Sequence, residues 1–249
     1  MPDASADDHV LAAKLATDAG RLLVQLRAGG GDGGRALGAR GDRSAHEMLM
    51  GGLAEARPGD AVLSEEGRDD AARLTAARVW IVDPLDGTRE YGEVPRSDWA
   101  VHVALVVDGA PVAGAVALPA RDLTLATGTP PPPPPPWSGA PRVLVSRSRP
   151  PAEATRIAEA LGGELVLLGS AGAKAMAVVL GEADVYAHSG GQYEWDSAAP
   201  VAVALAAGLH ASRLDGTPLA YNQPDPYLPD LLICRPELAD AVIAAAPRT

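Results

Sequence analysis

Two aspartates stand three positions apart where a hydrophobic run ends, in the sequence VWIVDPLDGTREY at positions 79–91. Asp83 follows β-branched residues, Pro84 has no backbone N–H to leave unpaired, and Asp86 precedes a Gly-Thr pair typical of a helix start. Free N–H groups at a helix start attract phosphate. Carboxylate oxygens suit Mg²⁺, which usually binds substrate phosphate together with a few carboxylates. The stretch therefore predicts phosphate chemistry on Mg²⁺.

Two other segments supply acidic residues of the same kind. Glu65 lies in SEEG, directly after the short apolar run at 61–63. Asp196 lies in EWDSAAP, at the N-cap or first turn of an apolar helix at 201–207. If these two carboxylates converge with Asp83 and Asp86, two divalent ions could lie about 3.5–4 Å apart, as in a two-metal hydrolase.

Each acidic residue also has an ordinary structural interpretation. A lone Asp-Gly pair usually forms a turn, a lone aspartate before a helix usually caps it, and Glu-Glu pairs are usually solvated surface. Three segments that each supply part of one metal site favour the functional interpretation. The five histidines are scattered without metal-ligand spacing, so a zinc site is not expected and each histidine is predicted to be structural.

The motifs SEEG, DPLDGTREY and EWDSAAP, in this order, resemble those of the inositol monophosphatase-like, lithium-sensitive Mg²⁺ phosphatases. Within that superfamily the chain is most similar to the actinobacterial CysQ-type 3'(2'),5'-bisphosphate nucleotidases, through the further segments GSAGAKAMAV, SRLDGTPLAYN and DPYLPDLL. The matches span residues 42–234. The resemblance implies a layered α-β-α-β-α sandwich of the inositol monophosphatase and fructose-1,6-bisphosphatase type, with the metal site in a cleft between two lobes.

The resemblance implies a reaction. It is Mg²⁺-dependent hydrolysis of the 3'-phosphate of adenosine 3',5'-bisphosphate, or of its sulfated form, which would remove a by-product of sulfate activation. Inositol 1-phosphate and fructose 1,6-bisphosphate are alternative substrates, because active sites in the family share the metal ligands and differ in the substrate wall. A metal-stabilised regulator that only binds the nucleotide is a non-enzymatic alternative, which the loss of a metal ligand would favour; none is lost here.

Aspartyl-phosphate phosphatases are a separate enzyme class whose nucleophile motif also contains Asp and Gly-Thr. That motif spaces its two aspartates two positions apart, whereas Asp83 and Asp86 are three apart. The spacing argues against a covalent intermediate.

The resemblance further implies ligands for two or three Mg²⁺ ions. Glu65, Asp83 and the Leu85 carbonyl would hold the first ion. Asp83, Asp86 and Asp196 would hold the second. The implied metal ligands lie on three separate segments, so the fold must bring them together.

The scissile phosphate and the attacking water have implied residues too. The Gly87 and Thr88 amides would bind the phosphate. Thr88 and Asp42 would take the proton of a water activated by the metal, and Glu65 is counted with them as catalytic. Ala39 stands where relatives commonly carry a threonine. Asp42 is also a candidate N-cap of the next helix, a role compatible with catalysis.

The substrate wall is implied by residues further along the chain. Ser170 and Lys174 would face the second phosphate and the sugar, and residues 146–149 would add donors. Lys174 has an alternative as a surface cation. The predicted substrate-binding residues are Leu85, Gly87, Thr88, Ser146, Ser170, Lys174, Glu194 and Asp196.

Three residues are candidates for the nucleoside part of the substrate. Glu194 could contact the sugar, and Tyr193 or Tyr221 could flank a base. Both tyrosines could equally be ordinary packing residues.

The rest of the chain predicts two lobes and a linker. Residues 1–128 form an N-terminal α+β lobe with most metal ligands, 129–138 a proline-rich linker, and 139–249 a C-terminal α/β lobe with the substrate wall and the last ligand. Helical periodicity covers 11–26 and 44–56. Strands at 101–107 and 112–118 flank Asp108-Gly109, a pair that favours a tight hairpin turn.

The second lobe alternates strands and helices. Strands are predicted at 143–145, 165–168, 185–187 and 231–234, and helices at 151–161, 173–180 and 198–207. Such alternation is typical of α/β folds.

Two low-complexity segments have competing interpretations. The seven prolines at 130–136 must form extended polyproline II, either as a surface linker or as a ligand of an SH3-type domain; without flanking basic residues we favour the linker. The glycine run at 28–34 could cradle phosphate, but it follows a helix and precedes no obvious one, so we predict a flexible loop.

The amino-acid composition limits the kinds of partner that the chain is expected to bind. A net charge of −11 opposes binding to nucleic acid, so a small phosphorylated metabolite is the expected partner. No apolar run is long enough to span a bilayer. The single cysteine, Cys234, excludes an intramolecular disulfide, and the acidic segment at 1–10 does not resemble a signal peptide, so the chain is expected to be cytoplasmic. A homodimer is among the allowed assemblies.

Overall fold

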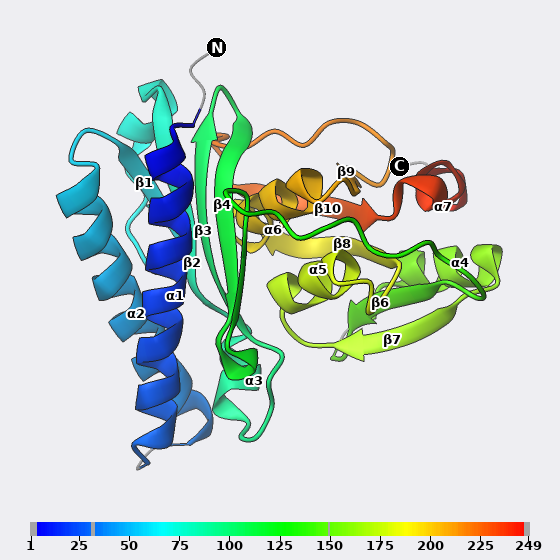
Figure 1. The fold of residues 1–249 in the computed structure, drawn as a ribbon, viewed down its shortest axis with the longest axis horizontal. Helices are drawn as coiled ribbons and strands as arrows, with labels where there is room; N and C mark the ends of the chain where they lie inside the picture. The colour runs from blue at the N-terminus through cyan, green and yellow to red at the C-terminus, as the bar shows by residue number, and fades with distance from the viewer. Residues whose placement is uncertain (1–3, 31–32, 149, 247–249) are drawn as a thin grey trace.

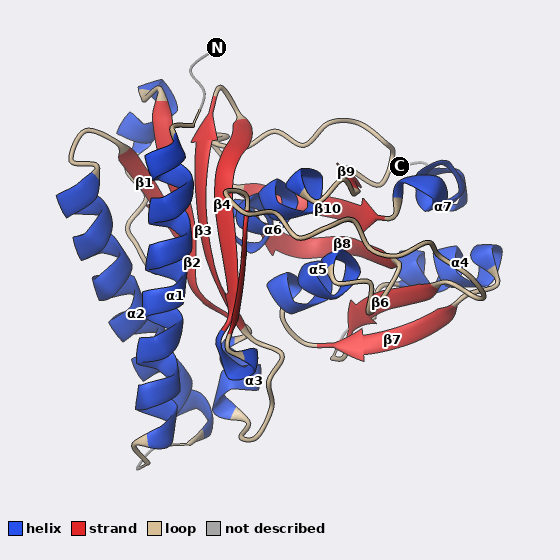
Figure 2. Ribbon diagram, in the orientation of Figure 1, coloured by secondary structure: helices blue, strands red, loops and turns tan. Residues whose placement is uncertain are grey.

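The computed structural model describes residues 4–30, 33–148 and 150–246. Two five-stranded sheets alternate with three layers of helices, which confirms the predicted sandwich (Figures 1 and 2). The helices are α1 (Ala6–Ala28), α2 (Gly34–Ala56), α3 (Thr88–Gly92), α4 (Ala152–Leu161), α5 (Ala171–Val179), α6 (Glu194–Ala206) and α7 (Ala239–Ala245). The strands are β1 (Ala61–Ser64), β2 (Arg78–Asp86), β3 (Ala100–Val107), β4 (Ala110–Leu118), β5 (Leu123–Ala126), β6 (Arg142–Ser146), β7 (Glu164–Leu168), β8 (Val185–Tyr193), β9 (His210–Ser212) and β10 (Tyr227–Cys234).

The first sheet has the strand order β1-β2-β3-β4-β5. Strands β1 and β2 run parallel, and the other neighbours are antiparallel. Strands β3 and β4 form the predicted hairpin, because Asp108 and Gly109 both adopt positive φ, at 51° and 75°. Successive side chains of this sheet point to opposite faces. One face packs against α1 and α2, and the other packs against α5 and α6. The central strand β3 is therefore buried on both faces.

The second sheet has the order β7-β6-β8-β10-β9. Helices α5 and α6 pack between the two sheets, and α4 and α7 cover the outer face (Figure 1). The core around α5 and α6 takes buried residues from both sheets, for example Ile81 of β2 and Ile233 of β10. The two lobes thus share one apolar core.

Helix α2 corrects one prediction. It begins at Gly34, ten residues before the predicted start at 44, because glycines interrupt the apolar pattern of its first half. Two of these glycines allow close packing: a Cβ at Gly38 would collide with Thr88, and one at Gly41 would lie 2.9 Å from the Tyr91 ring. Asp42 consequently lies inside the helix, so its predicted N-cap role is wrong.

Other element bounds differ because distant partners extend them. Strand β8 continues to Tyr193 because β10 pairs with it along its whole length. Helix α6 starts at Glu194, four residues earlier than the predicted 198, so that Asp196 lies in its first turn.

In the glycine run, positions 31 and 32 lie outside the described residues. None of the helices among the described residues is long and apolar enough to cross a membrane.

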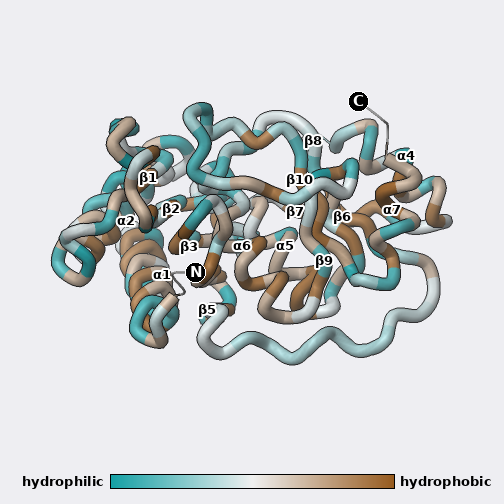
Figure 3. Tube along the Cα trace, turned by 90° about the horizontal axis from the view of Figure 1, so that it is seen from above, coloured by the Kyte–Doolittle hydropathy of each residue, from teal (hydrophilic) through white to brown (hydrophobic). Residues whose placement is uncertain are grey.

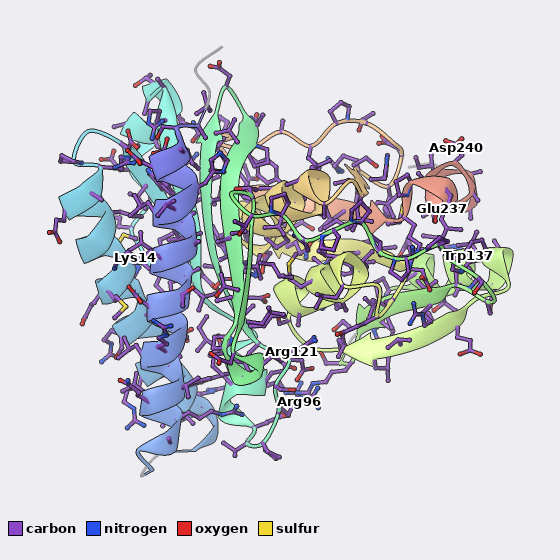
Figure 4. All side chains as sticks on the ribbon, viewed as in Figure 1. Lys14, Arg96, Arg121, Trp137, Glu237 and Asp240 are labelled. Atoms are coloured by element: carbon purple, nitrogen blue, oxygen red, sulfur yellow. The ribbon has the colours of Figure 1, made fainter. Side chains whose placement is uncertain are left out.

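The proline run forms an extended strap without helix or strand (Figure 3). Pro131, Pro134 and Trp137 are half-buried while the prolines between them are exposed, which is the three-residue repeat of polyproline II. Pro134 lies against Gly181, and Arg235 donates a hydrogen bond to the Pro135 carbonyl at 2.8 Å. Trp137, labelled in Figure 4, packs against the core of α4 and α7. One face of the strap therefore rests on its own protein.

We expect this one-sided packing to be visible in two double variants. Pro131→Ala with Pro134→Ala removes packed rings, whereas Pro132→Ala with Pro136→Ala removes exposed ones. Both pairs loosen the unfolded chain equally, so the packed pair should cost about 1–2 kcal/mol more in the free energy of unfolding. Thermal or urea unfolding measures this difference. Equal losses would contradict the one-sided packing, and a loss of turnover in the exposed pair would contradict the linker interpretation.

Candidate active site

Asp83 and Asp86 lie at the end of β2, where the register with β3 shifts between them. The shift leaves the ladder irregular, as in a β-bulge, and redirects side chains. Asp83 accepts a hydrogen bond from the Leu85 N–H at 3.0 Å. Gly87 follows with a φ of 84°, which favours glycine, and α3 begins at Thr88. The motif therefore folds as predicted, as a strand that ends in two carboxylates and enters a helix.

Asp196 joins this pair from the second lobe. It occupies the first turn of α6 and accepts a hydrogen bond from the Tyr193 N–H at 2.7 Å. Asp83, Asp86 and Asp196 each offer a carboxylate oxygen, and these oxygens all lie within 4.8 Å of one another. Glu65 follows β1, which runs parallel to β2, and its carboxyl group is hydrogen-bonded to that of Asp83. The structure thus brings the four predicted carboxylates together.

The four carboxylates differ in their pKa values. Burial, and then the charges of Glu65 and Asp86, raise the pKa of Asp83 well above its usual value. Burial and the charge of Asp86 raise the pKa of Asp196 to about 7. The Glu65 side chain is exposed as a whole, but desolvation of its carboxyl group raises the pKa to about 7. Buried carboxyl groups with raised pKa values ionise more readily when a positive charge lies beside them. This cluster therefore favours a bound cation.

Asp86 is the exception, and its hydrogen bonds explain why. Burial alone would raise its pKa, but donors outweigh burial and lower the pKa to about 2. His102 contacts the Asp86 carboxylate at 3.2 Å, the Ser170 hydroxyl donates at 2.5 Å, and the Gly172 N–H donates at 2.6 Å. Asp86 is thereby fixed to the first turn of α5 in the second lobe.

The donor set fits Mg²⁺. It consists of carboxylate oxygens, which this hard cation prefers. Burial, and then the charges of neighbouring carboxylates, raise the pKa values of Glu65, Asp83 and Asp196, and a divalent ion would favour their charged forms. The assignment of each ligand, including the Leu85 carbonyl, stays a prediction. That carbonyl also lies 3.1 Å from the Thr88 hydroxyl.

Asp42 and Thr88 meet beside this cluster, as predicted for a catalytic pair. The Thr88 hydroxyl lies 3.2 Å from an Asp42 carboxylate oxygen. Burial, and then the charge of Glu66, raise the pKa of Asp42 to about 7. A cavity of about 560 Å³ reaches the pair from the side of α2, and Ala39 is part of its lining. The pair is therefore positioned next to the carboxylates and accessible to solvent.

A second, smaller cavity of about 200 Å³ lies against the carboxylates of Asp86 and Asp196. Ser146, Ser170 and Lys174 line it together with Asp86 and Asp196. Gly87 lines it as well, so four predicted substrate residues share a cavity with the predicted metal ligands Asp86 and Asp196.

Lys174 is buried in this cavity wall, so the surface-cation alternative is wrong. Its ammonium group donates to the carbonyls of Gly169 and Ser170 and lies 5.2 Å from the centre of the Tyr186 ring. Burial lowers its pKa to about 8, although the nearby carboxylates, Asp86 first among them, favour the charged form. Ser170 caps α5, because its hydroxyl accepts from the Ala173 N–H at 2.9 Å.

Glu194 is placed away from this cavity. It is buried, and its carboxylate accepts hydrogen bonds from the Asn222 and Gln223 N–H groups, both at 2.7 Å. The geometry gives Glu194 a structural role, and its contact with the sugar stays a prediction without support. Tyr221 is fully buried, with its hydroxyl 3.2 Å from that of Ser197, as expected of a packing residue. Arg149 lies outside the described residues.

The sequence interpretation missed His102 as a site residue. It is fully buried in β3, with Nδ1 3.0 Å from the Trp195 carbonyl oxygen and Nε2 toward Asp86. Burial lowers its pKa, but the contacts with Asp86 outweigh this and raise it overall. A single polar residue in the apolar run AVHVALVV was the available signal. The absence of a side chain at Gly172 makes space for the His102 ring, since a Cβ there would collide with it.

The raised pKa values of Glu65 and Asp196 predict how pH affects the metal-free protein. These groups bind more protons in the folded chain than in the unfolded chain, so their contribution to the free energy of unfolding is largest below about pH 4 and is lost as pH rises to about 7. Mg²⁺ should therefore raise the unfolding temperature more at pH 8 than at pH 5.5. Thermal unfolding in EDTA and in Mg²⁺ tests this, with Asp196→Asn as the control that weakens both effects. A Mg²⁺ shift independent of pH would contradict the prediction.

Known proteins resemble this chain in both sequence and fold. Residues 11–129 and 140–248 match the inositol monophosphatase family. The 3'-phosphoadenosine 5'-phosphate phosphatase of Mycobacterium leprae is 53% identical over 249 residues, covering 95% of this chain and 92% of that protein. The 3'(2'),5'-bisphosphate nucleotidase CysQ of Escherichia coli is 32% identical over 199 residues, covering 75% and 80%. The crystal structure of CysQ from Bacteroides thetaiotaomicron has a TM-score of 0.81 at 28% identity, covering 92% and 97%. The motifs, the layered fold and these likenesses agree: the chain belongs to the inositol monophosphatase family.

Proposed function

We propose that this chain hydrolyses the 3'-phosphate of adenosine 3',5'-bisphosphate in a reaction that requires Mg²⁺. The observation that carries the proposal is the buried cation Lys174 in the same cavity as Asp86 and Asp196. A monophosphate needs only the metal site, whereas a bisphosphate offers a second anion to such a cation. The mycobacterial relatives are named for the same substrate.

The four carboxylates would hold the metal. When bound, Mg²⁺ lowers the pKa of an attacking water and neutralises charge on the phosphate oxygens. Asp83 and Asp86 are held by the end of β2, Asp196 by α6, and Glu65 by the end of β1. These elements belong to one packed core, so the ligands are preorganised at the edge of both lobes.

Asp42 and Thr88 handle the proton of the attacking water. A base with a pKa near 7 is well matched to proton transfer at neutral pH, and the pKa of Asp42 is raised to about 7. The Thr88 hydroxyl, 3.2 Å from Asp42, orients the water and passes its proton to the carboxylate. The amides of Gly87 and Thr88, at the start of α3, bind the scissile phosphate in this proposal.

Lys174 faces the phosphate that is not cleaved. Two of its three N–H groups are used by the carbonyls of Gly169 and Ser170, which leaves one donor for a ligand. This arrangement favours a bisphosphate over inositol 1-phosphate. It does not by itself separate adenosine 3',5'-bisphosphate from fructose 1,6-bisphosphate, so both belong in the substrate panel.

The proposal carries further expectations. We expect two or three Mg²⁺ ions at each site and a cytoplasmic enzyme. A homodimer is the first assembly to test, by light scattering. A non-catalytic regulator would bind the nucleotide without turnover, which the same substrate panel would reveal.

The first test is a rate comparison. With Mg²⁺, release of phosphate from adenosine 3',5'-bisphosphate should be faster than from fructose 1,6-bisphosphate or inositol 1-phosphate. Asp196→Asn keeps an oxygen to accept the Tyr193 N–H bond, so it should fold, yet it should lower kcat by about 100-fold or more because the metal loses a charged ligand. A folded variant with more than about a tenth of the wild-type rate would sink the metal assignment.

A second test uses the two lysines of the chain. Lys174→Met keeps most of the buried volume and removes the charge, and a charge-assisted hydrogen bond is worth about 1.5–3 kcal/mol. We therefore expect kcat/KM for adenosine 3',5'-bisphosphate to fall about 10- to 100-fold, with a much smaller effect on inositol 1-phosphate. Lys14→Met is the matched control, since Lys14 is exposed on α1 and pairs with Asp18 (Figure 4). Equal loss on both substrates would place Lys174 at the scissile phosphate instead.

A further inference from the structure

Aromatic side chains are scarce in this chain, and three of them meet at one place. The sequence has four tryptophans, five tyrosines and no phenylalanine. The rings of Tyr193 and Trp195 stack with centroids 4.8 Å apart and planes within 8°. The Tyr227 ring meets that of Tyr193 edge-on, at 5.8 Å and 82°. Tyr193 and Tyr227 are 41% and 42% exposed, so core packing does not account for them.

The residues of this aromatic cluster contact residues that line the smaller cavity. Tyr193 is the last residue of β8, and its N–H donates to Asp196 in the cavity wall. Tyr227 pairs with Tyr193 across β8 and β10, and its hydroxyl accepts a hydrogen bond from the Gly191 N–H at 3.2 Å. Gly191 and the neighbouring Gln192 also line the cavity. Tyr193 is thus tied by its backbone, and Tyr227 by its hydroxyl, to residues of the cavity wall.

The size of the cavity leaves part of the proposed substrate outside. Its volume is about 200 Å³, whereas pockets that bury a whole drug-sized ligand measure about 300–1,000 Å³. Its lining is rich in polar and charged groups, including Lys174, Asp86 and Asp196, which suits phosphates and a sugar. A nucleoside bisphosphate that places these parts in the cavity must leave its flat apolar base at the rim.

We propose that the exposed rings of Tyr193 and Tyr227 form a stacking wall for the base of the substrate. The inference rests on the proposed nucleotidase function. Aromatic side chains stack on bases with useful affinity, whatever the base, because every base has a π-face. The stacked Trp195 ring restrains Tyr193, and the Gly191 contact restrains Tyr227, so little side-chain freedom is lost on binding. The wall distinguishes a nucleotide from a sugar phosphate without selecting adenine.

The test compares two esters that differ only in the base. The first is adenosine 3',5'-bisphosphate, and the second is methyl ribofuranoside 3,5-bisphosphate, which has the sugar and both phosphates but no base. For the wild type, kcat/KM should favour the nucleotide. Tyr193→Leu should lower the ratio of the two kcat/KM values by about 5- to 150-fold, the effect expected for loss of one base stack. Tyr193→Phe keeps the ring and should keep most of the ratio.

Each outcome bears on the wall. Equal losses on both esters in Tyr193→Leu would show that Tyr193 acts through Asp196 or the fold, and an unchanged ratio would show that the base lies elsewhere; either overturns the inference. Tyr227→Leu provides the same comparison if Tyr193→Leu does not fold, as judged by circular dichroism. A wild type that cleaves both esters equally well also overturns the wall but leaves phosphatase activity intact. A wild type that cleaves neither ester defeats the proposed function itself.

Discussion

Repulsion among four neighbouring carboxylates is the constraint on which this structure depends. Asp83, Asp86 and Asp196 each place one carboxylate oxygen within 4.8 Å of the others, and the Glu65 carboxyl group is hydrogen-bonded to that of Asp83. Like charges at about 4 Å repel by about 1–4 kcal/mol per pair, depending on the local dielectric. Without a metal, the raised pKa values relieve part of this repulsion by protonation, and rigid elements hold the carboxyl groups in place. The β1–β2 pairing, the irregularity at the end of β2 and the first turn of α6 are those elements.

Asp86 connects this cluster to the packing of the two lobes. Its carboxylate accepts hydrogen bonds from Ser170 and from the first N–H groups of α5, which belong to the second lobe. His102, from β3, fills the space behind Asp86 and reaches the Trp195 carbonyl beside Asp196. Because α5 and α6 are also the middle layer of the shared core, the site is complete only when both sheets have packed on them. The site geometry therefore depends on the same packing that holds the two sheets together.

The features predicted correctly from the sequence are those that depend on residues close together in the chain. The carboxylates at the end of β2, the Asp108-Gly109 turn and the first-turn position of Asp196 all follow from residue types within a few positions. The start of α2 was missed because its glycines serve contacts with Thr88 and Tyr91, more than forty positions away. The role of His102 was missed for the same reason, and so were the distant N–H groups that hold Glu194. Local propensity carries no information about such long-range partners.

The net charge of −11 adds a final consequence for an anionic substrate. The protein as a whole repels a bisphosphate, and the metal-free carboxylates repel it most strongly at the reaction site. Lys174 alone does not reverse this repulsion, because its ammonium group already donates to two carbonyls. Four carboxylates also act on its charge, those of Asp86, Glu90, Asp98 and Asp196. In the proposed reaction, a divalent ion at the carboxylates would offset this repulsion. Substrate affinity is then expected to depend on the Mg²⁺ concentration.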